Sequence, residues 1–228
     1  MRMPHTNVST AQLSRTVVYL LARLMRNRAT RGLAPFVQPA LEQLEAAAAR
    51  TEEAERALVM ARANLEGADD ELDENVRQVD GRLLVHVGKN RKSDLYRKIF
   101  PQGLVAVTGA RIEDEVRAVK VLEEAIAREL AGVDFAVELG PKLRAAREEV
   151  EVQLPPYQAA LDALAAAWAA ELAARHGMRR QYRVVHAELV KLFPDNLRKV
   201  NSFFRDVGAR RTAPGPDAGE GGTGSEPA

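Results

Sequence analysis

The chain has 228 residues and a formal net charge of +1, and 46% of its residues are apolar, 5% aromatic and 29% charged. This length is sufficient to bury a hydrophobic core, and a composition rich in Ala, Leu, Glu and Arg is typical of long helices rather than sheets. The absence of cysteine excludes disulfides, thiolate metal ligands and cysteine nucleophiles, and it fits a reducing, cytoplasmic location. No apolar run approaches the roughly 18 residues of a membrane-spanning helix, so no transmembrane segment is predicted.

Residues 1–34 are predicted to form a basic N-terminal helix that begins at an N-cap, Ser9 or Thr10, and stops at Gly32. Its apolar residues recur at three- and four-residue intervals, which is typical of a helix face packed on a core. Residues 1–41 contain six Arg and no Asp or Glu, so an organellar transit peptide is an alternative. The regular stripe favours the core-facing helix. Its inward-facing apolar residues are Leu13, Val17, Leu20 and Leu24, and its outward-facing polar residues are Arg15, Arg23 and Arg26.

Residues 35–110 are predicted to form a helical hairpin. The pattern is helical from about residue 36 to 87 and is interrupted only at Gly67, so either two antiparallel helices or one bent helix fits. Apolar residues are spaced near 3.5 residues apart, which indicates a coiled-coil seam. Between residues 88 and 110 the chain is less regular, and residues 104–108 are interpreted as a short extended piece. The seam residues include Leu41, Leu44, Leu58, Leu65, Leu72, Val76, Val79 and Leu83.

Residues 111–207 are predicted to form a second hairpin. After a helix at about 112–130, Pro141 suits the first turn of the next helix. Pro155 and Pro156 each lack an amide donor and clash with the preceding turn, so they are expected to kink or break that helix.

The second hairpin is expected to end with a helix over residues 178–193, followed by Pro194 and a last helix over 196–207 for which Asp195 is the N-cap. The tail at 208–228 is rich in Gly, Pro, Ala, Ser and Glu and is predicted to be disordered. The fold class is therefore all-α, an elongated helical bundle of antiparallel coiled-coil-like hairpins.

Two heptapeptides resemble each other, KIFPQGL at 98–104 and KLFPDNL at 191–197. Both place Gly or Asn two residues after the proline, where a left-handed backbone is easiest for those residues. A tandem duplication would explain the match, and Phe100 and Phe193 would then both lie in the core. A Phe-Pro pair at a helix end is also common chemistry, so both interpretations stay open.

Charge is strongly segregated along the chain. Residues 42–80 contain twelve Asp or Glu against four Arg, and residues 175–211 contain ten Lys or Arg against three acids. If Gly67 and the Pro155-Pro156 pair mark hairpin tips, the hairpins are acidic and the Phe-Pro corners basic. The candidate anion- or partner-binding residues are Arg175, Arg179, Arg180, Arg183, Lys191, Arg198 and Lys199.

That basic cluster has two interpretations. It can neutralise phosphates of nucleic acid or of an anionic lipid surface. It can also be a solvated face beside the acidic hairpins of the same molecule, and the balanced net charge favours this second interpretation.

No catalytic residue, cofactor site or metal site is predicted. None of the four histidines stands in an HExxH or Glu-x-x-His arrangement, which are the helix-borne ligand patterns for zinc and di-iron centres. The acid run at 69–74 lacks the central glycine of an EF-hand. His86 is interpreted as a core or boundary residue, and Trp168 as a core anchor with an exposed binding hot spot as the alternative.

The sequence favours a non-enzymatic interaction or scaffold protein that acts through protein–protein contacts, with a protein partner or a second copy of the chain. The alternative is a module that binds nucleic acid or an anionic membrane surface through residues 1–34 and 175–211. These hypotheses differ in salt response, because binding that neutralises several phosphates weakens steeply with salt.

Overall fold

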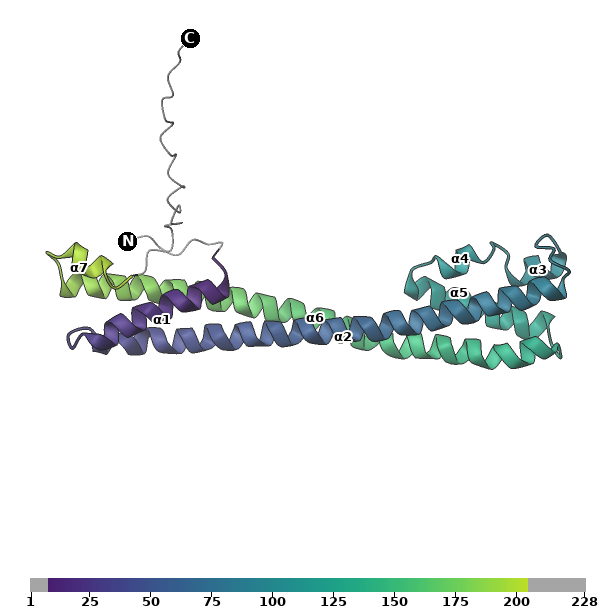
Figure 1. Ribbon diagram of the computed structural model, residues 1–228, viewed down its shortest axis with the longest axis horizontal. Coiled ribbons are helices and arrows are strands. Elements are labelled where there is room, and N and C mark those ends of the chain that lie inside the picture. The colour runs from purple at the N-terminus through teal and green to yellow at the C-terminus, as the bar shows by residue number, and fades with distance from the viewer. Residues whose placement is uncertain (1–7, 205–228) are drawn as a thin grey trace, which may run out of the picture. The chain divides into compact units, whose positions relative to one another are not determined.

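In the computed structural model, which describes residues 8–204, every regular element is a helix and no strand occurs among the described residues (Figure 1). The predicted all-α class is confirmed. The chain divides into two compact units, one formed by Met1–Ala46 with Ala173–Ala228 and the other by Ala47–Leu172; we call them unit 1 and unit 2. These units do not follow the predicted segments 35–110 and 111–207, because two long helices, α2 (Ala34–His86) and α6 (Asp134–Leu192), contribute to both. The tail predicted at 208–228 lies outside the described residues.

Unit 1 is built from α1 (Thr10–Arg26), the short 3-10 helix η1 (Arg31–Leu33), the start of α2, the end of α6 and α7 (Leu197–Asn201). In Figure 1, α1 runs alongside these parts of α2 and α6. Burial of apolar area is the main favourable term in such packing. Its fully buried residues include Leu13, Val17, Leu20, Leu24, Val37, Leu44, Met178, Tyr182, Val185, Leu189 and Val200.

Local side chains set the ends of α1. The predicted N-cap Ser9 is confirmed, because its hydroxyl accepts a hydrogen bond from the amide of Gln12 at 3.3 Å. At the other end the buried hydroxyl of Thr30 donates to the carbonyl of Leu24 at 3.0 Å. This carbonyl also accepts from the amide of the cap residue Asn27 at 3.3 Å, so the Thr30 bond adds a second partner at the helix end and supports the turn into α2.

Unit 2 contains the rest of α2, α3 (Asp94–Ile99), α4 (Val105–Thr108), α5 (Ile112–Glu129) and the first part of α6. Its buried positions on α2 and α6 follow one another at steps of three and four residues, so each helix presents one continuous apolar stripe. Packed with them are Val119, Leu122 and Ile126 of α5. The stripe residues are Leu65, Ala68, Leu72, Val76, Val79 and Leu83 on α2, and Leu139, Leu143, Ala146 and Val150 on α6.

Of the two alternatives at Gly67, the single helix is confirmed, because α2 passes through this position, and the predicted break at Pro155-Pro156 is wrong, because α6 continues through both prolines. Gly67 follows the buried Leu65 and precedes the buried Ala68, and this packing outweighs the cost of about 1 kcal/mol for glycine in a helix. Proline has no amide hydrogen, so Pro155 and Pro156 cannot donate to the carbonyls of residues 151 and 152. Both prolines and both of these residues are exposed. Water can therefore hydrogen-bond to these carbonyls, and neither position is a hairpin tip.

Three shorter predictions also change. Residues 104–108 belong to a turn and to helix α4 rather than to an extended piece. Pro141 lies well inside α6, which begins at Asp134. The N-cap of α7 is Asn196 rather than Asp195, since the Asn196 side chain accepts from the amide of Lys199 at 2.9 Å. The predicted end of that helix, residue 207, lies outside the described residues.

The two Phe-Pro corners lie in different units and differ in detail. Phe100 is 2% exposed in the unit 2 core, as predicted, whereas Phe193 is only half-buried and stacks on Phe203 with 6.4 Å between ring centroids. Gly103 has the expected left-handed φ of +84°, but Asn196 has φ −136° because it serves as an N-cap. The tandem duplication stays a prediction.

Candidate functional site

Positive charge gathers in unit 1. Its described residues include twelve Lys or Arg and four Asp or Glu, whereas unit 2 contains seventeen Lys or Arg and twenty-four Asp or Glu. The fold thus joins the basic N-terminal segment and the start of the basic 175–211 segment in one compact unit. Another basic stretch of the sequence, Lys89, Arg91 and Lys92, belongs to unit 2.

The seven predicted binding residues separate into two groups. Arg180, Arg183, Lys191, Arg198 and Lys199 are exposed. Arg175 is half-buried, and its guanidinium donates to the backbone carbonyl of Val8, which holds the segment before α1 against α6. Arg179 is only 7% exposed.

Burial lowers the pKa of the Arg179 guanidinium, and the positive charge of Arg175 lowers it further, because both disfavour the charged form. Arg175 and Arg179 are therefore parts of the unit 1 packing. This leaves the other five residues to meet a ligand.

Two of the five exposed residues already have an interaction within the unit. Lys191 forms an ion pair with Glu188 at 2.7 Å, and the ammonium of Lys199 lies 3.9 Å from the centroid of the Phe193 ring. An exposed ion pair contributes little to stability, so Lys191 can exchange its partner at small cost. Arg180, Arg183 and Arg198 form no ion pair among the described residues.

The outward side of α1 was only partly anticipated. Six exposed residues of α1 follow one another at steps of one and three residues and so share one face of the helix: Arg15, Val18, Tyr19, Ala22, Met25 and Arg26. We call these six residues the outer α1 face. Val18 and Met25 are each 50% exposed and Tyr19 is 38% exposed. The sequence analysis predicted the arginines on the outer side but missed the apolar residues between them. The spacing of Val18, Tyr19 and Met25 relative to Arg15 and Arg26 already indicated that they share one helix face.

Arg23, predicted on the polar face of α1, instead links α1 to the end of α7. Its guanidinium donates to the Ser202 hydroxyl at 3.2 Å and lies 5.8 Å from the centroid of the Phe203 ring. A cation over an aromatic ring is attracted by the ring quadrupole. Arg23 is therefore half-buried and contributes to packing.

Trp168 does not anchor the core. It is 55% exposed, and Leu172, one turn further along α6, is 50% exposed, whereas Leu164 on the buried side is 6% exposed. The prediction of a core anchor is therefore wrong. His86 is exposed as well, with its ring edge-on to Phe135 at 5.8 Å.

Unit 2 buries several charged groups. Glu115 is 2% exposed, and burial raises its pKa to about 8, with a hydrogen bond to Asp73 and the charges of Asp73 and Asp69 acting in the same direction. Glu115 lies on α5 against Asp69 and Asp73 of α2, so its proton affinity is raised by the contact between these two helices. Among residues 8–204, no three His, Asp or Glu are grouped as metal ligands would be.

Two other buried charged residues of unit 2, Asp80 and Arg147, are paired. The phenol of Tyr96 donates to Asp80 at 2.6 Å, and burial together with this bond raises its pKa to about 12. Arg147 binds Glu123 and Glu151, each at 2.7 Å, and so joins α5 to α6.

A groove of about 360 Å³ runs along α5 and α6, with Ile126, Ala127 and Val137 among its lining residues. Its charged lining residues include Glu123 and Arg144, which form an ion pair at 3.6 Å. These groups satisfy one another, so they supply no directed partner for a small ligand.

No described helix is both long enough and apolar enough to cross a membrane. Comparisons of the chain with protein-family models, with curated proteins and with solved structures gave no match. Function is therefore inferred from the residues of the two units.

Proposed function

We propose that this chain is a non-enzymatic helical interaction protein that acts through protein–protein contacts. The exposed Trp168 is the observation that carries the proposal. Tryptophan is the residue type most enriched at binding hot spots, and burying its solvated ring beside Leu172 would gain apolar area. The small alanines around Trp168 would let a partner helix approach closely.

A second copy of the chain is the partner that charge supports. Unit 1 carries an excess of eight positive charges among its described residues and unit 2 an excess of seven negative charges. Complementary patches orient two molecules and raise their association rate. The three- and four-residue steps of the buried stripes support coiled-coil-like pairing of α2 and α6, and the two heptapeptides support a duplication; both are parts of this proposal.

Molar mass by light scattering, measured over a range of protein and salt concentrations, tests self-association. We expect a mass above that of one chain, which falls toward it on dilution and in Trp168→Ala. The matched control is Val152→Ala, which shortens a residue of the same helix that is 60% exposed and should leave the mass unchanged. A single-chain mass at every concentration would refute self-association.

A second candidate function, polyanion binding by unit 1, has a specific observation in its favour. The fold brings Arg15, Arg26, Arg28 and Arg31 into the same compact unit as the exposed residues of the 175–199 segment. Retention on a phosphate-bearing column should collapse between low and moderate salt.

Charge reversal separates this surface from the rest of the chain. The double substitution Arg180→Glu with Arg183→Glu should abolish retention on the phosphate-bearing column. The double substitution Arg97→Glu with Arg117→Glu, at exposed positions of unit 2, should affect it much less. Equal effects of the two double variants would refute a site on unit 1.

A further inference from the structure

We propose that the outer α1 face docks unit 1 on an anionic lipid surface. Val18, Tyr19 and Met25 would enter the headgroup region, and Arg15 and Arg26 would pair with lipid phosphates. This inference rests on the second candidate function, polyanion binding by unit 1, and names its ligand.

The outer α1 face is held ready for such docking by the opposite side of the same helix. Leu13, Val17, Leu20 and Leu24 are completely buried in the unit 1 core, and Ser9 and Thr30 fix the two helix ends. The exposed apolar side chains are therefore presented by a helix that is already folded. Binding does not have to meet the entropy cost of forming that helix.

The charges on this face and in the turn that follows it are all positive. Residues 1–41 contain no Asp or Glu, and the exposed Arg28 and Arg31 follow the face in the turn toward α2. Basic residues near a bilayer are attracted by the negative surface potential of anionic lipids. Long arginine side chains can extend toward the phosphates while the neighbouring apolar residues lie deeper.

The apolar residues favour a lipid surface over nucleic acid. Phosphate-backbone binding needs only the arginines, and base stacking needs aromatic rings, of which this face has one, Tyr19. Val18 and Met25 gain nothing from a phosphate backbone but are solvated by acyl chains. Tyrosine is enriched at membrane interfaces, where its ring is apolar and its hydroxyl wet.

Vesicle co-sedimentation of the full chain is the direct test. We expect binding to vesicles of phosphatidylcholine mixed with phosphatidylserine and not to phosphatidylcholine alone. The double substitution Val18→Ser with Met25→Ser should weaken this binding about 10-fold or more, because interfacial affinity scales with the apolar area inserted. Arg15→Gln with Arg26→Gln should weaken it and reduce its salt dependence.

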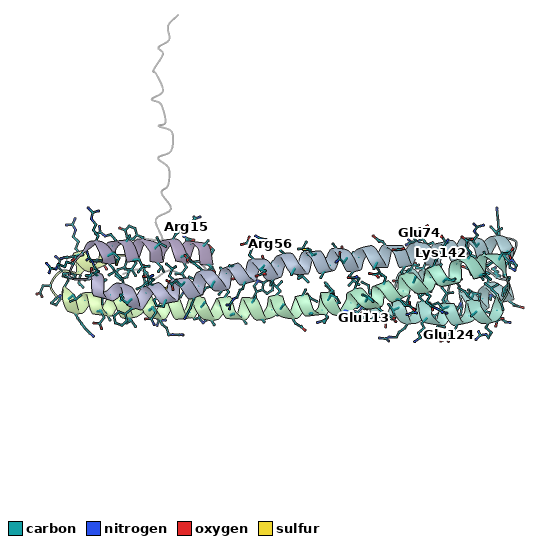
Figure 2. The ribbon with its side chains drawn as sticks, turned by 90° about the horizontal axis from the view of Figure 1, so that it is seen from below. Arg15, Arg56, Glu74, Glu113, Glu124 and Lys142 are labelled. Carbon is teal, nitrogen blue, oxygen red and sulfur yellow. The ribbon has the colours of Figure 1, made fainter. Side chains whose placement is uncertain are left out.

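Unit 2 offers matched control variants. Val59 and Met60 of α2 are each 68% exposed, so Val59→Ser with Met60→Ser makes the same chemical change outside the outer α1 face. For the arginine pair the control is Arg50→Gln with Arg56→Gln; Figure 2 shows Arg15 on α1 and Arg56 on α2. Both controls should leave vesicle binding unchanged, and thermal unfolding should show that all variants are folded.

A fluorescent DNA duplex provides the competing ligand. If the chain binds the duplex but not anionic vesicles, and binding depends on the arginines and not on Val18 and Met25, the lipid proposal is overturned while polyanion binding stands. If it binds neither probe, both fail. If it binds vesicles but the Val18 and Met25 variant binds as tightly as the original chain, docking through the outer α1 face is refuted.

Discussion

Unit 1 and unit 2 share two helices but differ in how much of their charge is exposed. Unit 2 buries Arg147, Asp80 and Glu115 and joins its helices through them. Unit 1 keeps most of its arginines in solvent and uses Arg175 and Arg179 for packing. A charge paired between helices contributes to the fold, whereas an exposed charge is available to a ligand, so the proposed anion recognition rests on the exposed arginines of unit 1.

The largest expected effect tests whether both apolar cores are essential. Leu20→Ala in unit 1 and Leu72→Ala in unit 2 each remove a completely buried side chain. Each should lower the free energy of unfolding by roughly 2–5 kcal/mol, since a cavity adds to the lost transfer energy. Chemical denaturation measures it, with Val59→Ala as the exposed control. A change within about 0.5 kcal/mol, as is usual for exposed sites, would show that the core in question is not formed.

The next prediction compares a buried with an exposed arginine. Arg147→Ala leaves Glu123, whose side chain is 10% exposed, with only the longer ion pair to Arg144. The expected loss is about 3 kcal/mol, because removing one partner leaves a buried charge poorly compensated. Arg180→Ala should stay within about 0.5 kcal/mol. Similar losses at the two sites, measured by urea unfolding, would contradict the contrast between the units.

Glu115 should make the stability of unit 2 depend on pH. Its pKa is about 8 in the fold against an ordinary 4.5, so the folded chain binds the extra proton between these values. Stability is therefore highest below about pH 4.5 with respect to this group and falls as pH rises toward 8. Glu115→Gln should match the original chain near pH 4 and exceed its stability by about 1–3 kcal/mol above pH 8, where an unsatisfied carboxylate is removed.

The control for this pH profile is Glu124→Gln. Glu124 belongs to the same helix, α5, but is exposed; Figure 2 labels it. Thermal unfolding across the pH range should show no change in the slope of stability for this variant. If Glu115→Gln has the same slope of stability against pH as the original chain, folding does not raise the pKa of Glu115.

The smallest expected effect is on the free energy of unfolding when Gly67, inside the continuous helix α2, is replaced. A Cβ added to Gly67 would meet no atom within 4 Å, so Gly67→Ala should stabilise the chain by up to about 1 kcal/mol. Gly132→Ala is the opposing control, because its φ of +79° is strained for alanine, and it should destabilise. Destabilisation by Gly67→Ala in denaturant unfolding would indicate that α2 is interrupted there.

The candidate site shows how far charge counting reaches. Composition alone pointed to the arginines of 1–41 and 175–211, and five of the seven predicted binding residues are exposed. Composition could not predict that Arg179 is buried in unit 1, because Arg179 and the exposed Arg180 are adjacent in sequence. They differ only in the helix face on which they lie. Composition also missed Val18, Tyr19 and Met25, since a second apolar stripe becomes visible only when the first is known to be buried.

Local patterns were sufficient for the helical class, for an N-cap of α1 at Ser9 or Thr10 and for the inward stripe of α1, because hydrogen bonds and periodicity within one helix depend on neighbouring residues. They were insufficient at Gly67 and Pro155-Pro156, where local propensity favours a break and packing on either side outweighs it. Only the tertiary structure decided that Trp168 is exposed and that the two basic segments lie in unit 1. Both outcomes depend on which distant helix covers each helix face.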